Sequence, residues 1–250
     1  MILLMLDFDG TLAPIRRRPE EAGIEPKTRR LLEALGKNPL ITLAVISGRS
    51  LADVREKTGV RGIAYAGCHG LEMEGPGWSF VHPKARRLRP LLKRAASELS
   101  AALGGLPGVM VEDKGLAVSV HYRKAGARGA GAAERAVSHT LSKYRNRLKP
   151  GRGRKVLELL PDVAWDKGRA VGLLLARHRR QRPCPVYIGD DLTDEAAFRA
   201  VRGRGLGILV ESRERTGGSD ASLRFGSTRQ VIKLLKALLP VGTGEGRGGQ

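Results

Sequence analysis

The sequence predicts an α/β protein built on a parallel sheet, with a second α/β module inserted into it. Short apolar runs alternate with amphipathic stretches at both ends of the chain, a pattern typical of strands and helices in a parallel sheet. The middle third instead has hairpin signals between helical stretches. Polar clusters follow several of the apolar runs, and open α/β sheets bind ligands at the carboxyl ends of their strands.

The first element is the apolar run Ile2 to Leu6, which is unbroken enough to be a strand buried on both faces. It ends at two carboxylates, Asp7 and Asp9, and Gly10 then allows a sharp turn. Two carboxylates held close together repel unless a cation or a proton relieves them. Alone, such a pair is most often a solvated turn, so its meaning depends on the rest of the chain.

The first third continues the alternation. A polar flap over the strand end is expected at 13–25, and the shared leucine face of Pro26 to Gly36 predicts a helix. A second buried strand, Leu40 to Ile46, ends at Ser47-Gly48-Arg49, and Ser50 can cap the next helix. A third strand is expected at Ile63 to Ala66.

The middle third predicts an antiparallel sheet with helices on one face. The expected elements are a hairpin of Leu71–Met73 and Trp78–Val81, a helix Pro83 to Leu103, a hairpin of Val109–Glu112 and Leu116–Tyr122, a helix Gly131 to Leu148 and a strand Val156–Leu160.

The last third returns to the first pattern. Asp166 can cap a helix from Lys167 to about Arg179, and the buried strand Pro185 to Ile188 stops at Gly189-Asp190-Asp191. The remaining expected elements are a short helix, strands at Gly207–Val210 and Ala221–Phe225, and a last helix after Ser227.

Net charge, aromatic content and cysteine spacing limit which ligands and partners are expected. The net charge of +20 attracts anionic small substrates and nucleic acid alike, but aromatic residues are only 4%, too few for an obvious base-stacking platform. Cys68 and Cys184 have no C-x-x-C neighbour, so no zinc site or disulfide framework is indicated. There is no signal peptide pattern and no long apolar span, so we expect a cytoplasmic protein that does not interact with membranes.

The residues at the strand ends predict phosphoryl transfer. Several carboxylates at one sheet edge favour a hard divalent cation, and Mg²⁺ suits a site that also binds phosphate. The Ser47 hydroxyl and Gly48 backbone can hold phosphate oxygens, and Lys167 can neutralise charge in the transition state. One carboxylate of the Asp7 and Asp9 pair can attack phosphorus while its neighbour serves the leaving oxygen and then the water.

Four ordered motifs carry a family resemblance. Asp7 to Leu12, Ser47-Gly48-Arg49, Lys167, and Gly189-Asp190-Asp191 with Asp194 resemble those of the haloacid dehalogenase superfamily of phosphatases. More narrowly, the chain resembles the trehalose-6-phosphate phosphatase family in Ser47-Gly48-Arg49, His69-Gly70, Glu112-x-Lys114, His121-Tyr122-Arg123, Trp165 to Gly168, and Gly189 to Glu195.

The resemblance implies a Rossmann-like haloacid dehalogenase core with a parallel sheet and an inserted α/β cap of the C2 type. The expected core is 1–78 and 159–240, the expected cap is 79–158, and 241–250 is expected to be a disordered tail. His69 is expected to shape the junction between core and cap.

The resemblance also implies the site roles. Asp7 would be the nucleophile, Asp9 the general acid and base, and Ser47 and Lys167 the phosphate ligands. Mg²⁺ would be held by Asp7, by the backbone carbonyl of Asp9 and by Asp190, with Asp191 or Asp194 holding its waters. The implied substrate contacts are Asp9, Gly48, Arg49, Glu112, Lys114, Arg123 and Glu158. Leu160 departs from the family, which often has Arg there or one place earlier, so contacts near Glu158 carry over less well.

The implied function is Mg²⁺-dependent hydrolysis of trehalose 6-phosphate to trehalose and phosphate through an aspartyl-phosphate, in trehalose biosynthesis. A monomer working beside a trehalose-phosphate synthase is expected. Another sugar phosphatase of the superfamily, acting on sucrose phosphate or mannosyl phosphoglycerate, is an alternative. An alternative of another class is a basic nucleic-acid-binding protein on an inactive phosphatase scaffold.

Overall fold

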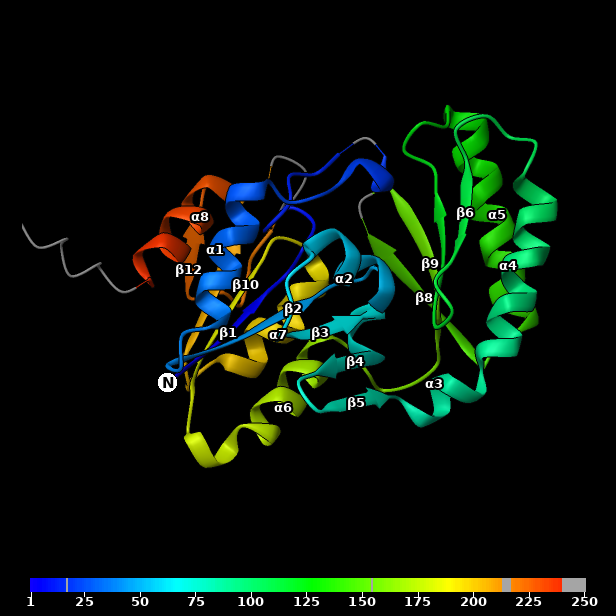
Figure 1. Ribbon diagram of the computed structural model, residues 1–250. Helices are drawn as coiled ribbons and strands as arrows, with labels where there is room; N and C mark the ends of the chain where they lie inside the picture. The colour runs from blue at the N-terminus through cyan, green and yellow to red at the C-terminus, as the bar shows by residue number, and fades with distance from the viewer. Residues whose placement is uncertain (17, 154, 213–216, 240–250) are drawn as a thin grey trace, which may run out of the picture.

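The computed structural model describes residues 1–16, 18–153, 155–212 and 217–239. These residues form two sheets, each covered by helices, joined side by side (Figure 1). The tail expected at 241–250 lies outside the described residues. Within the described ranges, no helix is both long enough and apolar enough to cross a membrane.

The larger sheet has eight strands in the order β12-β11-β10-β1-β2-β3-β4-β5. The first six of these strands pair in parallel, and β4 and β5 add an antiparallel hairpin at one edge. Since β1 lies between β10 and β2, its carboxyl end is near the middle of the sheet edge. The strands are β1 (Ile2–Leu6), β2 (Ile41–Ile46), β3 (Ala64–Gly67), β4 (Glu72–Gly75), β5 (Trp78–Val81), β10 (Cys184–Gly189), β11 (Leu206–Val210) and β12 (Leu223–Phe225).

Helices cover both faces of this sheet, which explains why β1 is apolar at every position. Leu4 and Leu6 pack into a cluster with α1 (Pro26–Gly36), α2 (Leu51–Thr58) and α8 (Thr228–Ala237). Leu3 and Met5 point to the other face, into a cluster with α6 (Lys167–Arg177) and α7 (Glu195–Val201). All four side chains are fully buried, as the sequence predicts for a strand inside a parallel sheet.

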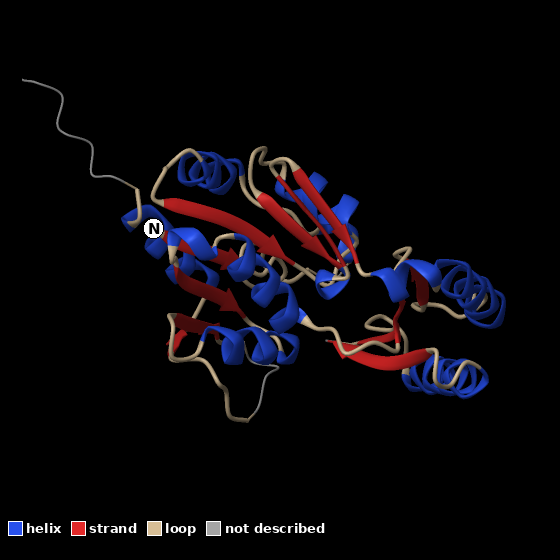
Figure 2. Ribbon diagram, turned by 90° about the horizontal axis from the view of Figure 1, so that it is seen from below, coloured by secondary structure: helices blue, strands red, loops and turns tan. Residues whose placement is uncertain are grey.

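The smaller sheet is antiparallel throughout, in the order β6-β7-β9-β8. Two helices cover the face that points away from the larger sheet, as Figures 1 and 2 show. The predicted antiparallel sheet with helices on one face is confirmed, but the hairpin expected within it at Leu71–Met73 and Trp78–Val81 belongs to the larger sheet, where it pairs with β3 as β4 and β5. Its elements are β6 (Met110–Asp113), β7 (Val118–His121), β8 (Leu148–Gly153), β9 (Val156–Pro161), α4 (Arg89–Leu103) and α5 (Ala127–Lys143).

Two predicted helices of this region are wrong in their bounds. The helix expected from Pro83 to Leu103 is divided into α3 (Pro83–Arg87) and α4 because Pro90 lacks the N–H that a continuous helix needs. The helix expected at 131–148 ends at Lys143, and the chain then forms β8. Pro150 disguises this strand in the sequence, but β8 is an edge strand, where proline is tolerated.

The expected domain boundaries, 78/79 and 158/159, fall inside β5 and β9. Since β5 pairs with the larger sheet and β9 with the smaller, we propose the junctions just after each strand. We therefore define the cap as residues 83–161 and the core as the remaining described residues. A buried apolar cluster joins them, with Cys68 and Leu71 from the core against Leu116 and Ala117 from the cap.

Candidate active site

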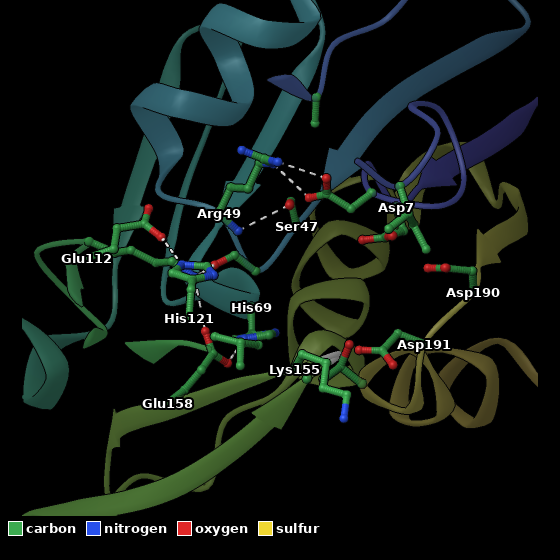
Figure 3. Close-up of a pocket in the computed structure, with 18 of the residues that line it drawn as sticks. Asp7, Ser47, Arg49, His69, Glu112, His121, Lys155, Glu158, Asp190 and Asp191 are labelled. Atoms are coloured by element: carbon green, nitrogen blue, oxygen red, sulfur yellow. Dashed lines mark hydrogen bonds and ion pairs between the residues drawn. The ribbon is translucent and has the colours of Figure 1, made fainter. Parts of the chain in front are cut away.

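The carboxyl ends of β1, β2 and β10 meet at one edge of the core sheet and face the cap across a cavity (Figure 3). Asp7 follows β1, Ser47 follows β2 and Asp190 follows β10, so the parallel topology brings together residues far apart in the sequence. The predicted site residues that line the cavity are Asp7, Asp9, Ser47, Gly48, Arg49, Glu112, Lys114, Arg123, Glu158, Lys167 and Asp190. Asp194 lies behind them and is fully buried.

A buried charge cluster lies at the centre of this edge. The Lys167 ammonium donates to Asp7 Oδ1 and to Asp194 Oδ1, both at 2.7 Å. Asp166 caps α6 by accepting from the Arg169 N–H, which fixes Lys167 in the first turn of the helix. Burial alone would lower the pKa of Lys167, but Asp194 and Asp7 raise it further than burial lowers it. The lysine is therefore charged.

The Asp194 carboxylate accepts hydrogen bonds that fix the loop after β10. Its Oδ1 accepts from the Tyr187 hydroxyl at 2.6 Å as well as from Lys167, and its Oδ2 accepts from the backbone N–H groups of Asp190 and Asp191. With four donors, the Asp194 carboxylate holds the loop after β10 and the lysine in fixed positions. Burial opposes its charge, but Lys167 and these hydrogen bonds lower the pKa of Asp194 overall.

The cluster has more negative than positive groups. Asp7, Asp190 and Asp194 offer carboxylate oxygens within 4.8 Å of one another. Burial, with added repulsion from Asp194 and Asp190, raises the pKa of Asp7 well above its ordinary value despite Lys167. A divalent cation among these oxygens would relieve that repulsion, and an all-oxygen donor set is what Mg²⁺ prefers. The residues present fit such an ion.

Gly10 is required by the closeness of this packing. Its φ of +81° lies in the left-handed region, and a Cβ built there would be 1.9 Å from Asp190 Oδ2. The glycine after the two aspartates therefore provides both the turn and the room for the Asp190 carboxylate.

The segment Ser47-Gly48-Arg49 follows β2 beside this cluster. The Arg49 N–H donates to Ser47 Oγ at 3.1 Å, and the Arg49 guanidinium donates to both carboxylate oxygens of Asp9 and to Asp53. Burial would lower the pKa of Arg49, but Asp9 and Asp53 raise it overall. Asp9 is thus held in a bidentate ion pair at the cavity wall.

The cap contributes carboxylates that are each paired with a histidine. Glu112 of β6 contacts His121 of β7, with Nε2 and Oε2 at 2.8 Å. Glu158 of β9 contacts His69 of the core at 3.0 Å and also accepts from Lys114. His69 therefore lies at the junction between core and cap, as predicted.

Sequence reasoning assigned no role at the site to several residues that are there. Tyr187 supports Asp194, while Arg16 of the flap, His121 and Lys155 line the cavity. Only Tyr187 carries a recognisable signal, since it is the one polar side chain in the strand before Gly189. His121 and Lys155 belong to the cap, so their places at the site depend on how the cap meets the core.

Comparison with known proteins assigns the family. A family model for trehalose-phosphatases matches residues 5–228. The chain belongs to the trehalose-phosphatase family. One relative in this family, the trehalose-phosphate phosphatase of Mycobacterium tuberculosis, is 42% identical over 211 residues, which are 83% of this chain and 53% of the relative. The chain thus spans about half the length of such relatives.

Solved structures agree with the trehalose-phosphatase assignment. The crystal structure of a trehalose-6-phosphate phosphatase related protein matches with a TM-score of 0.80 and 25% identity, covering 94% of this chain and 96% of that one. A haloacid dehalogenase-like hydrolase from Bacteroides thetaiotaomicron matches with a TM-score of 0.64 at 16% identity, covering 94% and 98%, which shows a shared fold. The predicted Rossmann-like core with a cap is confirmed.

Proposed function

We propose that the protein is a Mg²⁺-dependent phosphatase that hydrolyses trehalose 6-phosphate to trehalose and phosphate through an aspartyl-phosphate on Asp7. The observation that carries this proposal is the buried Asp7 carboxylate beside Lys167, within a cluster of three carboxylates at the strand ends. The names of the related proteins support the choice of sugar phosphate. We place the reaction in the cytoplasm, downstream of a trehalose-phosphate synthase, with the protein as a monomer.

The cluster residues divide the work of holding the ion. The Asp7 and Asp190 carboxylates and the Asp9 backbone carbonyl would hold Mg²⁺, and Asp194 would orient the Asp190 backbone from behind. When bound, the ion supplies positive charge to the phosphate oxygens and relieves the repulsion within the cluster. Lys167 and Ser47 would bind the remaining phosphate oxygens.

In the proposed first step, a carboxylate oxygen of Asp7 attacks phosphorus and the bond from phosphorus to the sugar oxygen breaks. Asp9 gives its proton to that oxygen, so the sugar leaves as a neutral alcohol. In the second step, water attacks the phosphoryl group, Asp9 takes a proton from the water, and the bond from phosphorus to Asp7 breaks. At the end of the cycle Asp7 is again a carboxylate and Asp9 again carries a proton, so both aspartates are as they began the first step.

The ion pair of Asp9 and Arg49 bears on this cycle. While both Asp9 oxygens accept hydrogen bonds from the guanidinium, neither oxygen is available to carry a proton to a leaving group. The pair must therefore open before the first step. Arg49 is one of the expected sugar contacts. Oxygens of a bound sugar phosphate would therefore compete with Asp9 for the guanidinium.

Recognition of the sugar is proposed for the cap side of the cavity. Glu112, Lys114, Arg123 and Glu158 line it there, opposite Gly48 and Arg49 of the core. Carboxylates and cations together can hydrogen-bond the many hydroxyls of a disaccharide, which act as both donors and acceptors.

The test is phosphate release from trehalose 6-phosphate with and without Mg²⁺, beside sucrose 6-phosphate, glucose 6-phosphate and an aryl phosphate. We expect Mg²⁺-dependent turnover with a strong preference for trehalose 6-phosphate. Turnover of the aryl ester alone would keep the chemistry and reject the sugar. If the folded protein is silent on all four esters and binds nucleic acid with a steep salt dependence, the phosphatase proposal is wrong.

A further inference from the structure

The backbone of Ser47-Gly48-Arg49 is hydrogen-bonded at every carbonyl. The Ser47 carbonyl accepts from the His69 N–H at 2.9 Å, and the Arg49 carbonyl accepts from the Cys68 N–H at 2.7 Å. The Gly48 carbonyl accepts from the Lys114 ammonium of the cap at 2.9 Å. The segment proposed to bind phosphate is thus held by one turn of the core and by one side chain of the cap.

The core turn that holds it is strained. Cys68 and His69 have φ values of 47° and 59°, in the left-handed region that residues other than glycine rarely adopt. The His69 ring then lies against Gly48, where a Cβ built on the glycine would be 2.8 Å from the ring. Backbone strain of this kind persists where the surroundings fix it, and it is frequent at functional sites.

From this position His69 reaches the cap. Its Nε2 contacts Glu158 Oε2 at 3.0 Å, while Glu158 Oε1 accepts from Lys114 and from the Ser119 hydroxyl. Glu158 and Lys114 are almost fully buried, so this ionic network is shielded from solvent. Two of the polar contacts between cap and core therefore meet at this segment, Lys114 with the Gly48 carbonyl and Glu158 with His69.

We propose that His69 is a positioning residue, which ties the docked cap to the phosphate-binding segment and thereby sets the geometry of Ser47. The proposal rests on the proposed function, since Ser47 is taken as a phosphate ligand. His69 acts through its neighbours and need not touch the substrate.

The contacts provide a physical route for this effect. Docking places the Lys114 ammonium on the Gly48 carbonyl, and that carbonyl belongs to the same peptide group as the Arg49 N–H. A cation on the carbonyl polarises the peptide and strengthens the N–H as a donor. That N–H donates to Ser47 Oγ, which fixes the hydroxyl so that its own hydrogen can be given to a phosphate oxygen.

The experiment compares His69→Asn and His69→Gln on trehalose 6-phosphate and on a small aryl phosphate. Asparagine tolerates the left-handed backbone but is too short to reach Glu158, whereas glutamine can present a donor near the position of Nε2. We expect His69→Asn to lower kcat/KM about tenfold on both esters, the effect of losing one charge-assisted hydrogen bond, and His69→Gln to recover most of it. A residue that merely contacted the sugar would affect the sugar ester alone.

A second readout does not depend on turnover. Small-angle X-ray scattering of the unliganded His69→Asn protein is expected to give a larger radius of gyration than the wild type, because the cap loses its contact with His69 and opens more often, although the apolar cluster and the Lys114 contact remain. His139→Asn, the same change at an exposed histidine of the cap, is the matched control and should leave both readouts unchanged.

The outcomes separate this proposal from the proposed function. A folded His69→Asn protein, with unfolding temperature near that of the wild type and unchanged kcat/KM on the aryl ester, would overturn the positioning role. If the wild type hydrolyses none of the esters, the proposed function fails, and unchanged scattering of His69→Asn would then overturn the docking contact independently.

Discussion

Asp7 shows how a single residue balances stability against chemistry. Its side chain is buried among two other carboxylates, and burial raises its pKa against the opposing effect of Lys167. A group that was only structural would gain by becoming neutral there. We infer that a bound cation offsets the cost of ionising Asp7, so that its carboxylate can act as the nucleophile.

Asp7→Asn is therefore expected to lower kcat by about a thousandfold or more while leaving the protein folded, because the amide cannot form the phosphoryl intermediate. Lys167 keeps its second partner, Asp194, so the cluster need not collapse. Phosphate release and mass spectrometry of acid-quenched protein measure turnover and phosphorylation of residue 7. Turnover near the wild-type rate would remove Asp7 from the nucleophile role.

Glu158 gives a pH-dependent prediction. Burial opposes its charge, but Lys114 and His69 lower the pKa of Glu158 well below its ordinary value of 4.5. A lowered folded-state pKa adds stability above that ordinary value, and the added stability is lost as the pH falls from 4.5 through the folded-state pKa.

Glu158→Gln should cost about 3 kcal/mol of unfolding free energy at neutral pH, since it leaves Lys114 buried without its charge partner. Below pH 4.5 the difference from the wild type should shrink, because the wild type protonates the same group. Urea unfolding of both proteins across this range measures it. A difference that stays constant down the series would contradict the assignment of the low pKa.

At the scale of elements, the turn after β1 couples the strand to the loop after β10. Gly10 and Asp190 come from these two neighbouring connections, and the glycine has no Cβ where the carboxylate lies. The sheet register thus determines that the residue after the aspartates is small.

Gly10→Ala is expected to lower activity by about a hundredfold, since Asp190 must move by the order of 1 Å to avoid the new methyl group. The left-handed φ adds about 1 kcal/mol of instability. Gly77→Ala is the matched control: Gly77 has a φ of +75° but open space around it, so it should show the strain without loss of activity. Equal activity losses in the two variants would contradict the close-approach argument.

The central strands β1, β2 and β10 of the core could be predicted from the sequence because each is a short apolar run that ends at a polar cluster. In β1, alternate side chains are buried on opposite faces of the sheet, so every position is apolar and the run is easily recognised. The division at Pro90 and the strand at 148–153 could not be found in the same way. Pro90 lies in the first turn of α4, and Pro150 lies in the edge strand β8. Whether a proline ends a helix or is tolerated in a strand depends on these positions, which are defined only in the folded protein.

The site was predicted to a similar extent. The motifs placed Asp7, Ser47, Lys167 and Asp190 at one edge, because parallel strands present their carboxyl ends together. The pairing of Arg49 with Asp9 and the contact of His69 with Glu158 were beyond sequence reasoning about spacing. Both contacts join segments that are far apart in the sequence, so residue spacing along the chain does not predict them.

For the whole molecule, a net charge of +20 surrounds a site rich in carboxylates. Arg16 and Arg123 line the cavity, and so does Lys155, so positive charge reaches the substrate route. Such a field raises the rate at which an anionic substrate arrives, without changing the chemical step.

The value of kcat/KM for a sugar phosphate should therefore fall about tenfold between about 0.01 M and about 1 M salt, as the Debye length shrinks from about 30 Å to about 3 Å. The value of kcat should change much less. Initial rates over this range, with Mg²⁺ held in excess, measure both. A flat kcat/KM profile would show that the charge does not guide the substrate.

The separation of the two modules also affects how substrate preference can evolve. The groups assigned to phosphoryl transfer belong to the core, whereas four of those assigned to sugar contact belong to one contiguous insertion. A lineage can therefore acquire a new sugar by changing that insertion while inheriting its chemistry intact. Substitutions at Lys114 and Glu158 are more constrained, because these residues also hydrogen-bond to the core. Divergence in sugar preference should then accumulate first at positions such as Glu112 and Arg123.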